Sequence, residues 1–137
     1  MPATGYSGTP LAKKLGIKEN YIIRLINAPQ YYFQLFTDFP ANVKVVTDTK
    51  SKKDFIHYFA VQAETLQKDI LSLKNQIQMN GIIWISWYKK SAKMPSDITE
   101  DFIRQLALRN GMVDIKVCAV DEMWSGLKLV IPVKERK

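Results

Sequence analysis

The chain has 137 residues, of which 47% are hydrophobic, enough for one ordinary core. Twenty Lys and Arg against thirteen Asp and Glu give a formal net charge of +7, which favours anionic partners. The single cysteine, Cys118, excludes an internal disulfide and a cysteine metal cluster. No apolar run reaches the roughly 20 residues of a membrane span, and the N-terminus lacks the pattern of a secretory signal. We therefore expect one cytoplasmic domain over residues 1–137, with no membrane partner.

Residues 1–20 are predicted to form a polar lead-in that ends in one short helix. Thr9 is a suitable N-cap, Pro10 fits the first helical position, and Gly16 fits the left-handed position after the helix. Leu11 and Leu15 are four residues apart, so both would face the body of the domain.

Beyond residue 20, β-type and helical patterns alternate. Apolar runs rich in β-formers predict strands at 21–26, 43–46, 55–61, 81–88, 113–120 and 127–131. A turn at 27–29 opens a short helix at 30–36, and longer helices are expected at 63–78 and from about 97 to 110. Asn80-Gly81 is expected to stop the first long helix, and Asp97 with Glu100 to cap the second.

The order of these elements, β-α-β-β-α-β-α-β-β, favours right-handed crossovers and a mainly parallel sheet. The strand at 81–88 does not alternate, which is typical of a central strand covered on both faces. The last two strands would form an antiparallel hairpin. This order resembles the methyltransferase variant of the Rossmann fold with one helix–strand unit missing. We therefore predict a single truncated α/β Rossmann-like domain with helices on both faces of the sheet.

Three segments resemble a bacterial family known as a domain of unknown function, the one numbered three-zero-five-two. They are GYSGTPLAKKLGI at 5–17, WYKKS at 87–91 and KVCAVDEMWSGL at 116–127. The resemblance spans nearly the whole chain and implies a small cytoplasmic α/β protein. It brings no catalytic residues with it.

The methyltransferase-like order makes S-adenosylmethionine the ligand to test. Folds of this kind bind a nucleoside beyond the carboxyl ends of the strands, with a glycine-rich first turn and an acid after the second strand. Asp48 stands 21 residues after Asn27, where that acid belongs. The turn that begins at Asn27 has no glycine, however, and Pro29 removes an N–H donor. The sequence thus predicts no bound cofactor, with S-adenosylmethionine as the alternative.

Lys89, Lys90 and Ser91 directly follow the central strand, so they would lie on the ligand side of a parallel sheet. They are a candidate site for a small anionic ligand; the alternative is a solvated basic loop. Nonspecific nucleic-acid binding would need the lysine groups at 13–18, 50–53 and 89–93 to share a face. Sequence-specific binding is not expected, because lysine far outnumbers arginine.

The inventory of catalytic residues is thin. His57 is the only histidine and lies in an apolar strand, so a packed sheet histidine is favoured over a general base. Cys118 has no second histidine to activate it. Helix capping already accounts for Asp97, Glu100 and Asp101. We predict no catalytic residues and no metal site.

Trp124 lies in the hairpin turn at 121–126, beside two acids. It would either fold back on the core, which is the favoured reading, or present an anchor to a protein partner.

The leading functional hypothesis is a non-enzymatic cytoplasmic binding or interaction module. Its degenerate nucleotide-binding crevice would lie near Asn27, Asp48 and Lys89–Ser91. A divergent S-adenosylmethionine-dependent methyltransferase is the first alternative, and nonspecific nucleic-acid binding is the second.

Overall fold

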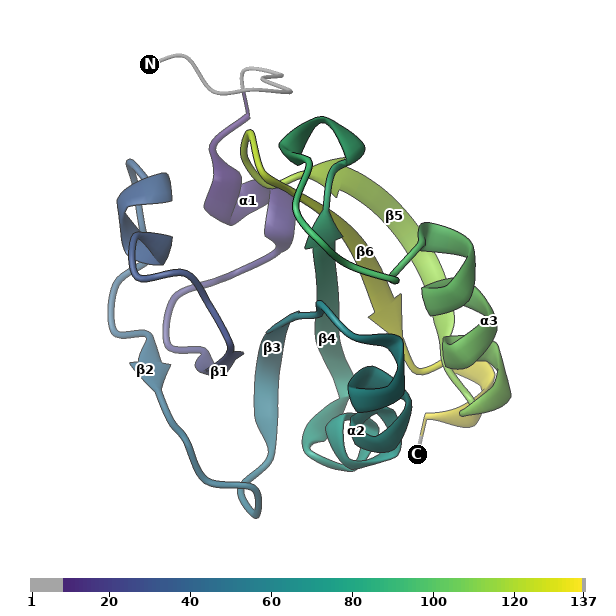
Figure 1. Cartoon of the computed structure of the whole chain (residues 1–137). Helices are drawn as coiled ribbons and strands as arrows, with labels where there is room; N and C mark the ends of the chain where they lie inside the picture. The colour runs from purple at the N-terminus through teal and green to yellow at the C-terminus, as the bar shows by residue number, and fades with distance from the viewer. Residues whose placement is uncertain (1–8, 137) are drawn as a thin grey trace.

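The computed structural model describes residues 9–136, so the first eight residues of the lead-in, with the Gly5–Gly8 part of the family resemblance, lie outside it, as does Lys137. One six-stranded sheet has the order β2-β1-β3-β4-β6-β5 (Figure 1). Its strands are β1 Ile22–Ile26, β2 Lys44–Val45, β3 Lys53–Phe59, β4 Ile77–Tyr88, β5 Val113–Ala119 and β6 Trp124–Val130. The first four run parallel, and β6 is antiparallel to both β4 and β5. This confirms the predicted mixed sheet with its C-terminal hairpin.

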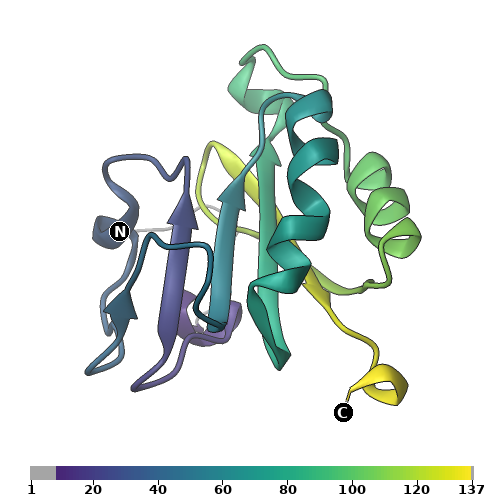
Figure 2. The ribbon, with the colours of Figure 1, turned by 90° about the horizontal axis from the view of Figure 1, so that it is seen from below.

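Helices cover both faces of this sheet, as predicted. They are α1 Leu11–Leu15, α2 Ala63–Asn75 and α3 Glu100–Arg109, with 3-10 turns η1 Tyr32–Leu35, η2 Lys90–Ala92 and η3 Val133–Glu135. α2 and α3 lie side by side on one side of the sheet (Figure 2). α1 and η1 pack on the other. None of the helices within residues 9–136 is long and apolar enough to cross a membrane.

Alternation along β3 assigns its side chains to two separate cores. Ile56 and Tyr58 pack with the apolar face of α2, of which Leu66 and Ile70 are buried. Phe55, His57 and Phe59 point to the opposite face, where Phe55 packs with α1 and the other two contact Tyr32 of η1. The helical spacing seen in the sequence therefore identified the correct buried face of α2.

The Asn80-Gly81 pair does not stop a helix, so that prediction is wrong. α2 already ends at Asn75, and β4 begins at Ile77. Lys53 pairs with Ile77 whereas Phe55 pairs with Ile82, so residues 78–81 form an irregular bulge. A Cβ on Gly81 would lie 2.9 Å from the Ile77 Cβ. Glycine is needed here because the bulge brings the chain against itself.

The helix caps also differ from the prediction. Pro10, not Thr9, occupies the N-cap position of α1, while Gly16 has the expected positive φ of 88°. α3 begins at Glu100, where the Thr99 hydroxyl accepts a hydrogen bond from the Phe102 N–H at 3.1 Å. Asp97 therefore does not cap its own helix. It accepts a hydrogen bond from the N–H of Ala63, at the start of α2.

Candidate functional site

A cavity of about 480 Å³ opens at the carboxyl ends of β1, β3 and β4, beside the first residue of β6. Its walls come from the loop after β1, from the end of β3 with the start of α2, and from the ends of β4 and the β5–β6 hairpin. The lining residues are Asn27, Pro29, Tyr31, Tyr58, Phe59, Ala60, Val61, Gln62, Thr65, Tyr88, Met123 and Trp124. No charged side chain is among them. The cavity is within the size range of small-molecule sites.

An aromatic group forms the wall nearest β6. The rings of Tyr88 and Trp124 are stacked with centroids 4.0 Å apart, and Phe59 meets Trp124 edge-on at 4.9 Å. Trp124 is only 5% exposed, so it folds back on the core. Its role as an anchor for a partner stays a prediction. The sequence placed Trp124 in a loop, whereas it is the first residue of β6.

Asp121 fixes the hairpin turn that carries this wall. Its Oδ1 accepts hydrogen bonds from the N–H groups of Met123 and Trp124, both at 2.8 Å. Burial raises the pKa of Tyr31 to about 12, and the hydrogen bond and charge of Asp121 act in the same direction. Tyr31 is therefore a neutral phenol at the cavity.

The loop after β1 reaches the cavity without glycine. Asn27 takes the left-handed conformation, with φ of 58°, which asparagine tolerates better than most residues. The N–H of Tyr32 then bonds to the carbonyl of Pro29 at 3.0 Å and opens the η1 turn. Asn27 and Pro29 both line the cavity. The signal that the sequence analysis missed here is asparagine itself, which makes the turn in place of glycine.

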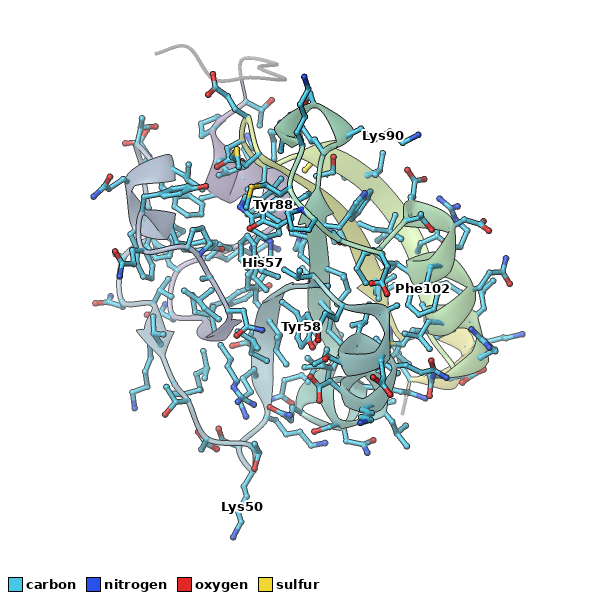
Figure 3. All side chains as sticks on the ribbon, in the orientation of Figure 1. Lys50, His57, Tyr58, Tyr88, Lys90 and Phe102 are labelled. Carbon is cyan, nitrogen blue, oxygen red and sulfur yellow. The ribbon has the colours of Figure 1, made fainter. Side chains whose placement is uncertain are left out.

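Asp48 lies at the opposite end of the sheet, which corrects its assignment to the crevice. Its carboxylate accepts hydrogen bonds from the N–H groups of Ser51 at 2.6 Å and Lys50 at 3.1 Å. It also lies 3.8 Å from Nζ of Lys53, the first residue of β3. Figure 3 shows Lys50 at the far end of the molecule from Tyr88 and Lys90. The pKa of Asp48 is lowered to about 2, mainly because Ser51 donates hydrogen bonds to its carboxylate.

Asp48 lies far from the carboxyl edge because β2 is short. This strand has two residues, which pair only with Ile22 and Ile23 at the beginning of β1. The chain therefore leaves the sheet well before the carboxyl edge and turns back through Lys50 and Ser51. A spacing of 21 residues identifies a ribose-binding acid only if the second strand is as long as the first.

Lys89, Lys90 and Ser91 do lie at the carboxyl edge. The N–H of Lys89 bonds to the carbonyl of the cavity-lining Met123 at 2.8 Å, and Lys90 and Ser91 continue into the η2 turn. Lys90 and Ser91 are exposed. The structure therefore brings this loop and Asn27 to the same edge, without Asp48.

His57 lies beneath the cavity in a buried polar chain. Its ring nitrogens contact the Tyr32 hydroxyl at 2.9 Å and the Ser86 hydroxyl at 2.8 Å. The ring stacks on Phe59, with centroids 4.3 Å apart. Burial lowers the pKa of His57 to about 3, so the imidazole is neutral at pH 7. This is the packed sheet histidine that the sequence favoured.

The remaining candidates do not gather into a catalytic cluster. Cys118 is half-buried on the edge strand β5, and burial raises the pKa of its thiol. Glu100 and Asp101 pair with Arg104, which also bonds to Asp114 of β5 at 3.0 Å. Between Thr9 and Arg136, no three His, Cys, Asp or Glu side chains are grouped as metal ligands would be.

Comparison with solved structures identifies the fold. A putative type 11 methyltransferase from Sulfolobus solfataricus has a TM-score of 0.63 at 15% identity, over 93% of this chain and 92% of that one. A SAM-dependent methyltransferase from Aquifex aeolicus has a TM-score of 0.61 at 16% identity, over 89% and 88%. Magnesium protoporphyrin IX methyltransferase from Synechocystis PCC 6803 has a TM-score of 0.57 at 11% identity, over 89% and 74%. The chain has a methyltransferase-like α/β fold in a short form.

No family model and no curated protein matches the chain, so the resemblance to the domain of unknown function is not confirmed. The expectation that the protein has no cofactor is corrected by the solved structures. The Synechocystis enzyme of this fold was solved with S-adenosylmethionine bound, as was an O-methyltransferase from neocarzinostatin biosynthesis. The missing glycines argue against a cofactor, but these two proteins of the same fold were solved with one bound.

Proposed function

We propose that the protein is a divergent S-adenosylmethionine-dependent methyltransferase that binds its cofactor in the cavity at the carboxyl edge. The observation that carries this proposal is the position of the cavity. It lies beyond β1 and β3 in a sheet of methyltransferase-like order, which is where open α/β sheets bind their ligands. The solved methyltransferases of the same fold support it.

The lining residues suit the chemistry of the cofactor. The ring faces at Tyr31 and Tyr88 would stack on adenine and attract the sulfonium cation. Gln62 and Thr65 supply neutral hydrogen-bonding groups at the start of α2 for the ribose and the amino-acid end. The cofactor would bring the transferable methyl group. The cavity would bind it through stacking and neutral hydrogen bonds, in place of a glycine turn and a ribose-binding acid.

The basic loop at the rim would bind the substrate. Lys89 is anchored to the hairpin through Met123, and Lys90 and Ser91 are exposed beside Tyr88. Two ammonium groups and a hydroxyl would attract a phosphate or carboxylate. Asn27, on the other side of the opening, would contact the bound cofactor or substrate.

Calorimetric titration with S-adenosylmethionine and S-adenosylhomocysteine tests the proposal. Thr65→Trp fills the cavity from the first turns of α2, and Gln67→Trp puts the same bulk on an exposed position of that helix outside the lining. We expect saturable binding by the wild type and by Gln67→Trp, and its loss in Thr65→Trp. No binding by the wild type, or equal binding by both variants, would contradict it.

A non-enzymatic module that binds the same ligand is the second candidate. The uncharged lining favours it, because no lining carboxylate or histidine is placed to accept a proton from a substrate. Transfer of a labelled methyl group into the protein or RNA of a bacterial extract separates the two. Cofactor binding without any transfer supports the module, whereas transfer that Thr65→Trp abolishes supports the enzyme.

A further inference from the structure

Four lysines lie where the β5–β6 hairpin packs against α1 and the residues that follow it. We call them the lysine cluster: Lys14, Lys18, Lys116 and Lys128. Lys116 and Lys128 are cross-strand partners in the β5–β6 ladder. Lys116 Nζ donates to the carbonyl of Lys14 in α1 at 3.2 Å. The Nζ of Lys128 lies 3.7 Å from the position that a Cβ on Gly16 would occupy, which brings it to the end of α1. Lys18 follows Gly16 by two residues, and its charge acts on Lys128.

Within residues 9–136, no carboxylate lies within ion-pair distance of any of these four ammonium groups. Like charges directly opposite in a ladder are unfavourable, so the Lys116–Lys128 pair costs stability. Burial lowers the pKa of Lys128, and the charges of Lys116 and Lys18 lower it further. The fold therefore holds together a positive charge that it does not neutralise.

We propose that the lysine cluster binds the phosphodiester backbone of a single-stranded nucleic acid, and that nucleic acid is the substrate class of the cavity. The second half of this inference rests on the proposed methyltransferase function, whereas the first does not. Ammonium groups bind phosphates as point charges, without the fork geometry of arginine. Such contacts are independent of sequence, and they dominate nonspecific affinity for nucleic acids.

The placement of the cluster on β6 favours a strand of nucleic acid over a compact anion. Lys128 lies four residues along β6 from Trp124, about 13 Å at about 3.3 Å per residue. Trp124 lines the cavity. The loop that carries Lys89 and Lys90 also lies at the rim of the cavity, where the Lys89 N–H bonds to the carbonyl of Met123 in the hairpin. A flexible polyanion is able to follow the lysine cluster and still reach the opening. A single small phosphate cannot touch both.

Fluorescence anisotropy with a short labelled single-stranded RNA, measured over a range of salt concentrations, tests the inference. Lys116→Gln/Lys128→Gln removes two charges from the lysine cluster. Lys68→Gln/Lys134→Gln removes two exposed charges elsewhere and is the matched control. The measured quantity is the slope of the logarithm of the binding constant against the logarithm of the salt concentration. We expect this slope to become shallower by about 1.4 in the first variant, at about 0.7 per lost contact, and to stay unchanged in the second. The first variant should not melt below the wild type, because it relieves a repulsion.

If RNA binding weakens equally in both double variants, only net charge matters, and the proposed role of the lysine cluster is wrong. Absence of RNA binding by the wild type at low salt would overturn it as well. Tighter cluster-dependent binding to phosphatidylserine vesicles or to polyglutamate would replace the nucleic acid with a membrane surface or an acidic protein. Because the double variants leave the cavity intact, their titration with S-adenosylmethionine separates failure of this inference from failure of the proposed function.

Discussion

The carboxylate of Asp97 accepts a hydrogen bond from the backbone N–H of Ala63 at 2.7 Å, across 34 residues of sequence. Ala63 is the first residue of α2, whose own N-cap residue, Gln62, provides no side-chain cap. The loop between β4 and α3 therefore supplies the missing acceptor. Since Gln62 lines the cavity, this contact also fixes one wall of the site.

Replacing Asp97 by alanine should lower the free energy of unfolding by about 1 kcal/mol, the usual value of a helix N-cap. Asp97→Asn should retain most of the stability, because its amide oxygen also accepts the bond. Urea denaturation of the two variants measures the difference. If both lose the same amount, the carboxylate acts through charge and not as a cap.

The buried His57 should make stability depend on pH. Its pKa falls from an ordinary 6.5 to about 3 in the folded protein, so the unfolded chain binds the proton first as pH decreases. The contribution is complete above pH 6.5 and is lost as pH falls from there toward about 3. Between pH 7 and pH 5 we expect a loss of about 2 kcal/mol. Denaturant titrations at both pH values measure it.

His57→Gln is the control for this prediction, because His57 is the only histidine in the chain. Its unfolding free energy should be nearly constant over the same pH interval, whatever its absolute stability. A variant that keeps the wild-type pH dependence would assign the effect to other groups.

Gly126 should be intolerant of even a methyl group. A Cβ there would lie 2.9 Å from the Trp84 ring, which is itself fixed by a hydrogen bond from its Nε1 to the Leu15 carbonyl at 2.7 Å. Gly126→Ala should cost about 1–3 kcal/mol of stability through overpacking. Ser125→Ala, at the neighbouring and less buried position, should cost far less in the same thermal unfolding experiment. Equal costs would contradict the close approach.

Binding in the cavity should alter the fluorescence of Trp124, because its indole lines the wall against Tyr88. We expect S-adenosylmethionine to change the emission of the wild type and to leave Trp124→Phe unchanged. The phenylalanine keeps an aromatic ring in the wall, so the cavity should still bind the cofactor by calorimetry. A residual change in Trp124→Phe would place the ligand near Trp84 or Trp87 instead.

Much of the fold was predictable because hydrophobic period and turn residues act locally. The run at 81–88 gave the central strand, and the spacing of Leu66, Ile70 and Leu73 gave the buried face of α2. Gly16 was also recognisable, since its positive φ is a property of one residue. The strand order followed from these elements together with the handedness of crossovers.

The site was less predictable because its residues depend on distant contacts. Asp48 was misplaced because nothing local shows that β2 has only two residues. Asp97 was assigned to the helix that follows it, whereas Thr99 takes that position and leaves Asp97 for α2. The aromatic wall was missed because Tyr31, Tyr88 and Trp124 come from three separate segments that only the folded sheet brings together.

Lys53 is fully buried, in contrast to the members of the lysine cluster. Its side chain has no exposed surface, and its Nζ bonds to the Ser51 carbonyl at 2.7 Å. An acylating reagent therefore has no access to this amine while the chain is folded. In a chemical labelling experiment, Lys53 would therefore serve as an internal reference. It should be acylated only in those protein molecules that have lost their native structure.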